Sequence, residues 1–323
     1  MLSTPNWIAP AASSRLRAVA VVAGLGLGSL QAAVKAIEEG RADALGMSGP
    51  KSLEEEIAEL KAAESVDAEL EAMKAALSRF PEDMLEEAGL RIKVDGKEPY
   101  DRFRGRLMLP IEDARGRVIA FGGRILDAAK TDAPKYLNSP DTPLFDKGRT
   151  LYNLHRAGPA SRQTGRLIVV EGYMDVIALS AAGIADAVAP LGTALTERQI
   201  ELLWRLVEAP VLCFDGDAAG QRAAMRAVTR ALPLLRPAHT LRICRLPTGL
   251  DPDDLLKREG TAAMERVLSG ARSLIDTLWE HERDALPLAT PEDKAGLKAR
   301  LLAHVETIAD NDIKSLYRRD LLE

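Results

Sequence analysis

Residues 167–175 read Leu-Ile-Val-Val-Glu-Gly-Tyr-Met-Asp, and residues 211–217 read Val-Leu-Cys-Phe-Asp-Gly-Asp. In each segment a short apolar run ends abruptly in carboxylates and a glycine. Apolar runs of this length are typical of strands buried in a parallel sheet. The two segments therefore predict strands whose carboxyl ends carry Glu171, Asp215 and Asp217, at the edge where open α/β sheets bind their ligands.

Three carboxylates gathered at one edge repel one another unless a cation lies between them. Divalent metal is the natural candidate, because Mg²⁺ takes carboxylate oxygens and keeps positions open for phosphate. Taken alone, Asp215-Gly216-Asp217 favours a simple strand-to-helix turn with a capping Asp. Together with Glu171 at the end of a preceding apolar strand, the pattern instead favours a site for one or two Mg²⁺ ions that hold a phosphoryl group.

Strands and helices alternate around these segments, which predicts a parallel sheet with helices on its faces. The predicted strands are Leu167–Val170, Ala185–Ala189, Val211–Phe214 and Thr240–Arg245. The predicted helices are Met174–Ala182, Thr196–Val207 and Gly220–Leu235. Upstream, two apolar runs flank Asp113–Gly116 and predict a β-hairpin. Downstream of Asp254 the chain reads as helical.

Composition limits the class of protein. The chain has 323 residues and a net charge of −5, but residues 100–166 hold 13 Lys/Arg against 7 Asp/Glu. A basic segment beside an acidic site suits a protein that holds a polyanion on one surface and metal ions at another. Two cysteines and four histidines give no zinc-binding spacing, and no apolar stretch is long enough to span a membrane, so we expect a cytoplasmic protein.

The two acidic segments resemble the Toprim motif pair, which occurs in primases, topoisomerases and some nucleases. Several other strings resemble the RNA polymerase core of bacterial replicative DNA primases. They are Tyr100–Arg106, Phe121–Arg124, Pro134–Pro140, Phe145–Arg149, Val170–Val176 and Asp251–Asp254. The resemblance runs from about Ala72 to the C-terminus and implies an α/β fold. This fold is a Toprim-type parallel sheet flanked by helices, preceded by a small mixed α+β basic subdomain and followed by a helical subdomain.

The resemblance also implies the site residues. Glu171, Asp215 and Asp217 would be catalytic and bind Mg²⁺ or Mn²⁺, and Asp251 and Asp253 would support them near the metal and nucleotide. Ten residues would contact nucleic acid or NTP: Arg102, Arg104, Arg106, Arg124, Lys135, Asn138, Lys147, Arg149, Gly172 and Asp175. For Arg104 and Arg106, a solvated surface charge is an equally weighted interpretation.

The implied organisation has four parts. They are an unassigned N-terminal segment with a charged helix (1–71), a basic subdomain (72–165), a Toprim domain (166–255) and a helical subdomain (256–323). The zinc-binding and helicase-binding domains usual in the family have no counterpart here. The implied partners are single-stranded DNA template, NTPs and the RNA–DNA hybrid, with the replicative helicase and single-strand-binding protein as partners of full-length relatives.

The implied activity is DNA-templated synthesis of short RNA primers by metal-dependent nucleotidyl transfer. Two alternatives stay open at this stage. One is a metal-dependent nuclease that uses the same acids, and the other is a non-catalytic fragment that binds single-stranded DNA.

Overall fold

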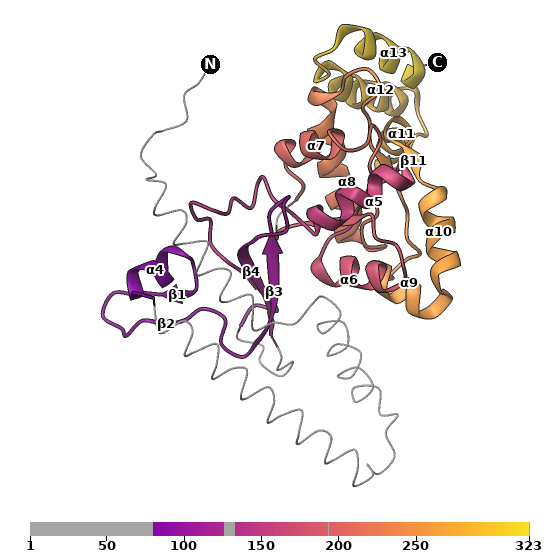
Figure 1. Cartoon of the computed structure of the whole chain (residues 1–323). Coiled ribbons are helices and arrows are strands. Elements are labelled where there is room, and N and C mark those ends of the chain that lie inside the picture. Colours follow the sequence, from indigo (N-terminus) through magenta and orange to yellow (C-terminus); the bar gives the residue numbers. More distant parts are fainter. Residues whose placement is uncertain (1–79, 126–132, 193, 323) are drawn as a thin grey trace. The chain divides into compact units, whose positions relative to one another are not determined.

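A computed structural model of the chain describes residues 80–125, 133–192 and 194–322 (Figure 1). The chain divides into two compact units, residues 1–146 and residues 147–323. The unassigned segment 1–71 and the charged helix expected at 51–79 lie outside the described residues. Residues 147–165, which the sequence places in the basic subdomain, belong to the second unit. The division into four parts stays a prediction.

The first unit contains a small antiparallel sheet. Its described elements are α4 (Glu82–Glu87), β1 (Arg91–Ile92), β2 (Tyr100–Asp101), β3 (Arg106–Glu112), β4 (Val118–Ile125) and β5 (Tyr136–Asn138). β4 lies between β3 and β5, and all three run antiparallel. The predicted hairpin is confirmed: the Asp113 N–H donates to the Arg117 carbonyl at 2.9 Å, and Gly116 takes the left-handed conformation with φ of +75°.

The second unit is built on a six-stranded sheet. Its strands are β6 (Leu151–Tyr152), β7 (Ile168–Val169), β8 (Ala187–Pro190), β9 (Val211–Leu212), β10 (Arg242–Ile243) and β11 (Arg272–Ser273). The spatial order is β11-β10-β9-β7-β8-β6. The four central strands are parallel, whereas β6 and β11 pair antiparallel at the two edges. The α/β fold is confirmed, but the sheet is mixed, because short return strands pair with both of its edges.

Helices pack around this sheet and extend beyond it (Figure 1). They are α5 (Leu154–Thr164), α6 (Tyr173–Ala181), α7 (Glu197–Trp204), α8 (Ala218–Ala231), α9 (Pro252–Glu259), α10 (Thr261–Ser269), α11 (Leu274–Ala285), α12 (Pro291–Glu306) and α13 (Asn311–Leu322). The predicted cap of α7 is confirmed, since Thr196 Oγ1 accepts a hydrogen bond from the Gln199 N–H at 3.1 Å. α8 ends earlier than predicted, because Pro233 converts the last turn into a 3₁₀ helix.

The core of the second unit joins the sheet to the helices on its faces. Leu167, Val169 and Leu212 are completely buried, and they belong to one apolar cluster with side chains of α7, α8, α11 and α12. Because the central strands are buried on both faces, their carboxyl ends emerge at one edge with little freedom to move. The fold thus gives the residues that follow β7 and β9 a rigid base.

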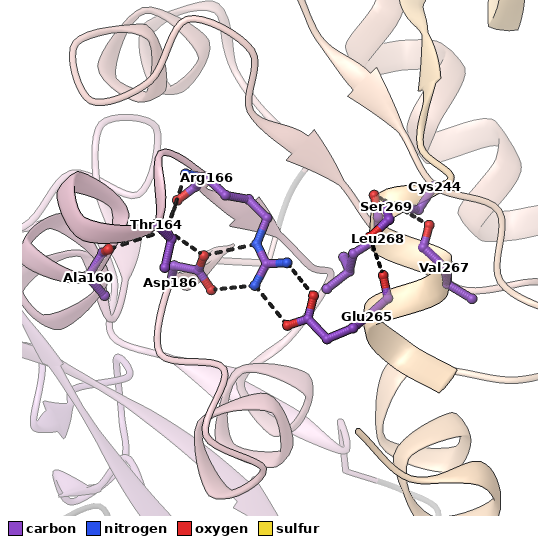
Figure 2. A network of polar contacts seen from close by, with 9 residues as sticks. All are labelled: Ala160, Thr164, Arg166, Asp186, Cys244, Glu265, Val267, Leu268 and Ser269. Atoms are coloured by element: carbon purple, nitrogen blue, oxygen red, sulfur yellow. Dashed lines mark hydrogen bonds and ion pairs between the residues drawn. The ribbon is translucent and has the colours of Figure 1, made fainter. Parts of the chain in front are cut away.

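A polar network closes the opposite edge of the sheet (Figure 2). The Arg166 guanidinium, just before β7, donates to both carboxylate oxygens of Asp186 and to both of Glu265 on α10, at 2.6–3.3 Å. Asp186 is only 1% exposed, so Arg166 compensates a buried charge. The network ties the amino ends of β7 and β8 to α10 and leaves the carboxyl ends to the acidic residues.

Candidate metal and polyanion sites

Glu171 and Asp215 meet at the carboxyl ends of two neighbouring strands. β7 and β9 pair in parallel with Val169 opposite Leu212, so the residues that follow both strands lie side by side. The Asp215 N–H donates to Glu171 Oε1 at 3.1 Å. Asp215, the first acid after strand β9, therefore lies directly against Glu171, the first acid after strand β7.

Asp217 marks the beginning of helix α8. One oxygen of its carboxylate accepts the N–H groups of Ala219 and Gly220, both at 2.8 Å. The capping turn weighed in the sequence is therefore present, and it satisfies two of the unpaired donors of the helix terminus. The cap also holds Asp217 in place on the same strand-to-helix turn as Asp215, two residues earlier in the chain.

Gly216 and Gly220 allow the backbone to pack tightly around these acids. A Cβ added to Gly216 would lie 2.1 Å from the Pro247 carbonyl oxygen, and one added to Gly220 would lie 2.1 Å from the Asp215 carbonyl oxygen. Gly216 also donates its N–H to the Leu250 carbonyl at 2.9 Å. The segment before α9 is thereby held against the acidic turn.

Two further acids come with that segment. Asp251 caps α9 by accepting the Asp254 N–H at 2.6 Å, and Asp253 is 7% exposed and pairs with Lys257 at 2.6 Å. The charges of Asp251 and Asp254 act on the carboxylate of Asp215. The fold therefore brings Glu171 and the acids at the start of α9, about eighty positions later in the chain, into a common electrostatic environment.

Burial and neighbouring charges raise the pKa of three acids at this edge, Glu171, Asp175 and Asp215. Burial, then the charges of Glu171, Asp251, Asp217 and Asp254, raise the pKa of Asp215 to about 7. Burial, followed by Asp215 and Asp251, raises the pKa of Asp175 to about 8. Burial also raises the pKa of Glu171, against the hydrogen bond from the Asp215 N–H. This concentration of negative charge is what a cation would stabilise.

These acids suit a hard divalent cation. The potential ligands are all carboxylate oxygens, as Mg²⁺ and Mn²⁺ prefer. The Asp215 Oδ1 atom is buried and has no hydrogen-bond partner. Within residues 80–125, 133–192 and 194–322, no three Asp, Glu, His or Cys side chains already converge as a complete ligand set. A bound ion would therefore require side-chain rotations, while the donor chemistry fits.

Asp175 and Gly172 flank the site on α6. The Asp175 carboxylate accepts the Gly172 N–H at 3.0 Å and closes the first turn of the helix. Asp175 is 8% exposed and interacts electrostatically with Asp215. Both residues expected to contact nucleotide thus adjoin Glu171, and Asp175 also stabilises the turn that carries it.

The basic residues expected in the first unit gather around its antiparallel sheet. Arg102 Nε donates to the Asn138 carbonyl at 3.1 Å, beside strand β5. The Arg124 guanidinium lies 6.0 Å from the Tyr136 ring centre, and the Lys135 ammonium lies 5.9 Å from the same centre. The sheet therefore collects positive charge and an exposed aromatic ring, a combination suited to single-stranded nucleic acid.

Arg104 and Arg106 differ from each other. The Arg104 guanidinium lies over the Tyr100 ring at 4.7 Å. Arg106 donates to the carbonyls of Gly123 and Pro134, at 3.2 and 2.8 Å. The hydrogen bonds of Arg106 join β4 to the chain before β5, so this side chain has a structural role that the sequence did not reveal.

Lys147 and Arg149 belong to the second unit. The buried Gln199 side chain donates to the carbonyls of Lys147 and Thr150, at 3.0 and 2.8 Å. Thr196 Oγ1 donates to the Gly148 carbonyl at 2.6 Å. The cap of α7 thereby holds the loop that carries both basic residues.

Two charged neighbours of the acids were not evident from the sequence. Asp254 raises the pKa of Asp215, and the charge of Arg226 on α8 acts to lower that of Glu171. Arg226 lies nine residues after Asp217, within helix α8. Its position could have been found only by combining the start of α8 with the neighbouring strand order.

Comparisons with known proteins agree with the two sequence segments. Residues 62–158 match the DNA primase catalytic core, N-terminal domain, and residues 165–246 match the Toprim domain. A DNA primase of Neisseria meningitidis is 47% identical over 219 residues, which is 68% of this chain and 36% of that protein. The chain thus spans little more than a third of the length of that curated relative.

Two solved structures are similar over most of the described fold. A DNA primase domain from Pseudomonas aeruginosa has a TM-score of 0.70 and 44% identity, and the match covers 74% of each chain. A DnaG primase catalytic domain bound to single-stranded DNA has a TM-score of 0.67 and 42% identity. That match covers 74% of this chain and 76% of the other.

Proposed function

Because the chain belongs to the DNA primase family, through its catalytic core and Toprim domain, we propose that it synthesises short RNA primers from NTPs on single-stranded DNA. The reaction is nucleotidyl transfer, in which a 3′ hydroxyl attacks the α-phosphate of an NTP and pyrophosphate leaves. One observation carries the proposal: Glu171 and Asp215 are hydrogen-bonded at the ends of adjacent parallel strands, and Asp217 caps the following helix.

Glu171, Asp215 and Asp217 would hold Mg²⁺ or Mn²⁺, with Asp251 and Asp253 as supporting acids. When bound, the metal supplies a lowered pKa for the attacking hydroxyl and stabilises charge on the leaving oxygens. The chain itself contributes the carboxylates on a tightly packed turn, because the backbone lies too close to Gly216 and Gly220 to admit a side chain there. We assign no side chain as general base.

The basic residues would hold the polyanions. Arg102, Arg104, Arg124 and Lys135, with Asn138, would contact nucleic acid or NTP from the first unit, and Lys147 and Arg149 from the second. Arg106, whose hydrogen bonds go to backbone carbonyls, would hold this surface together. Gly172 and Asp175 would contact the nucleotide beside the acids. Arginine offers forked contacts to phosphate and lysine a mobile point charge, and neither reads base identity. The relative bound to single-stranded DNA supports this assignment.

The rest of the proposal concerns the cellular setting. We place the protein in the cytoplasm, where the replicative helicase and single-strand-binding protein would act with the full-length family members. In the described part of the chain, every helix is too short or too polar to cross a membrane. The four-part domain organisation predicted from the sequence belongs to the same proposal.

Incorporation of labelled NTPs on single-stranded DNA, with Mg²⁺ or Mn²⁺, tests the activity. We expect synthesis by the wild type and none by Asp215→Ala, with both proteins giving the same circular dichroism spectrum. The same reactions are checked for loss of template. Template cutting that depends on Asp215 would make the protein a nuclease, and salt-dependent DNA binding without incorporation would make it a non-catalytic fragment.

A further inference from the structure

Helix α8 carries three arginines at four-residue spacing, Arg222, Arg226 and Arg230. This spacing places them along one side of the helix. Arg230 is anchored, because it donates to the carbonyls of Ala194 and Leu195 at 3.2 and 2.7 Å. In contrast, Arg222 and Arg226 are exposed and form no hydrogen bond or ion pair with any residue that the structure describes.

The anchor of Arg230 shows which way this side of α8 faces. Ala194 and Leu195 follow strand β8, which neighbours β7 in the sheet. Arg226 is one turn closer to Asp217, and side chains on a helix tilt toward its amino end. Arg226 therefore lies between Arg230 and the start of α8, on the side of the helix that faces the residues following β8.

The electrostatics of Glu171 agree with this position. The positive charge of Arg226 acts to lower the pKa of Glu171, although burial raises it more strongly. No ion pair joins the two side chains in the part of the chain that the structure describes, so the donors of the Arg226 guanidinium stay available. Such a position suits an anion that is bound beside the acids rather than by them.

We propose that Arg226 binds the polyphosphate of the reaction, namely the β- and γ-phosphates of the incoming NTP and the pyrophosphate that leaves. The inference rests on the proposed function, because the ion held by the acids is what would bring a polyphosphate to this edge. A fork of N–H donors matches two phosphate oxygens, which a lysine cannot do. Arg226 is thus a binding residue for the leaving group, separate from the residues expected to hold template.

Binding of inorganic pyrophosphate by the full chain, measured by calorimetry with and without Mg²⁺, tests this role. We expect Arg226→Ala to weaken Mg²⁺-dependent pyrophosphate binding by roughly tenfold or more, as for loss of a charged hydrogen bond. The pyrophosphate affinity of Arg226→Lys should lie between those of the wild type and Arg226→Ala. Arg266→Ala is the matched control, because Arg266 is also exposed on a helix of this unit and forms no side-chain bond with a described residue.

Kinetics and DNA binding separate this role from a general loss of structure. Arg226→Ala should raise the KM for NTP and weaken product inhibition by pyrophosphate, while affinity for a single-stranded oligonucleotide stays at the Arg266→Ala value. Equal pyrophosphate affinity in Arg226→Ala and Arg266→Ala would overturn the inference. A loss of oligonucleotide affinity in Arg226→Ala as large as its loss of pyrophosphate affinity would overturn it too. Wild-type protein that binds no divalent ion would overturn both this inference and the proposed function.

Discussion

The acidic turn combines two properties that sequence reasoning treated as alternatives. Asp217 caps helix α8 with one carboxylate oxygen, and Asp215 leaves a buried oxygen without a hydrogen-bond partner. The cap therefore does not compete with a metal site, because it fixes the backbone that presents Asp215. The spacing of Asp215, Gly216 and Asp217 was sufficient to predict this turn, since it needs only a strand that ends and a helix that begins.

Gly216 offers a test at the scale of one residue. Gly216→Ala would drive its Cβ to within 2.1 Å of the Pro247 carbonyl oxygen. We expect this overpacking to lower the free energy of unfolding by roughly 1–3 kcal/mol and to displace Asp215, so that divalent-metal affinity also falls. Urea unfolding and a Mn²⁺ titration measure the two effects.

Gly296→Ala is the matched control for this substitution. Gly296 lies inside helix α12, and the nearest atom to an added Cβ outside the helix backbone would be Arg300 Nη1 at 3.8 Å, the end of a flexible side chain. Alanine there should leave stability unchanged or raise it, because alanine favours the helix over glycine by about 0.5–1 kcal/mol. Equal stability in Gly216→Ala and Gly296→Ala would contradict the close packing at the acidic turn.

At the scale of elements, the central strands were predictable and the edge strands were not. β7 and β9 lie inside long apolar runs, and burial on both faces imposes such runs. β11 consists of Arg272 and Ser273 alone, so its two residues show no periodicity to recognise. β6 pairs with β8 through contacts that are distant in sequence, which local patterns do not encode.

The helices after the sheet are joined by a pH-sensitive contact. Glu282 on α11 is buried and accepts hydrogen bonds from Arg300 at 2.7 Å and His304 at 2.9 Å, both on α12. Burial alone would raise the pKa of Glu282, but these two partners outweigh it and hold the pKa below its ordinary value of 4.5. The carboxylate therefore stabilises the folded state when it is ionised.

We expect Glu282→Gln to lower the free energy of unfolding at pH 7 by about 1–3 kcal/mol, as for loss of a charged hydrogen bond. The difference from wild type should be complete above pH 4.5 and shrink as the pH falls through the lowered pKa. Urea unfolding between pH 3 and pH 7 (about ten conditions would suffice) measures it. Glu306→Gln is the control, since Glu306 is exposed and its ion pairs are long. A pH-independent difference would contradict this assignment.

At the scale of the whole molecule, positive charge is segregated within a chain of net charge −5. The resemblance predicted basic residues that the structure groups on the first unit's sheet, with Lys147 and Arg149 on the second. The sequence did not separate side chains free to bind phosphate from those that hold the fold together. Arg106 is the clearest case, because its hydrogen bonds go to backbone carbonyls.

Salt dependence of DNA binding tests this distinction. Binding to a single-stranded oligonucleotide should weaken as salt rises, because phosphate contacts release counterions. Arg124→Ala should reduce the slope of log affinity against log salt by about 0.7 and leave urea unfolding unchanged. Arg106→Ala should instead lower the free energy of unfolding by about 1 kcal/mol or more. An Arg124→Ala slope equal to that of wild type would remove Arg124 from the nucleic-acid surface.

Mn²⁺ binding detected by electron paramagnetic resonance tests the central claim most directly, because free and bound ions give different signals. We expect the wild-type chain to bind Mn²⁺, Mg²⁺ to compete for the site, and Asp215→Asn to lose most of the affinity while keeping the wild-type circular dichroism spectrum. Glu282→Gln, which alters an acid outside the site, should bind Mn²⁺ as tightly as wild type at pH 7. If Asp215→Asn retains wild-type affinity, the carboxyl ends of β7 and β9 do not form the metal site.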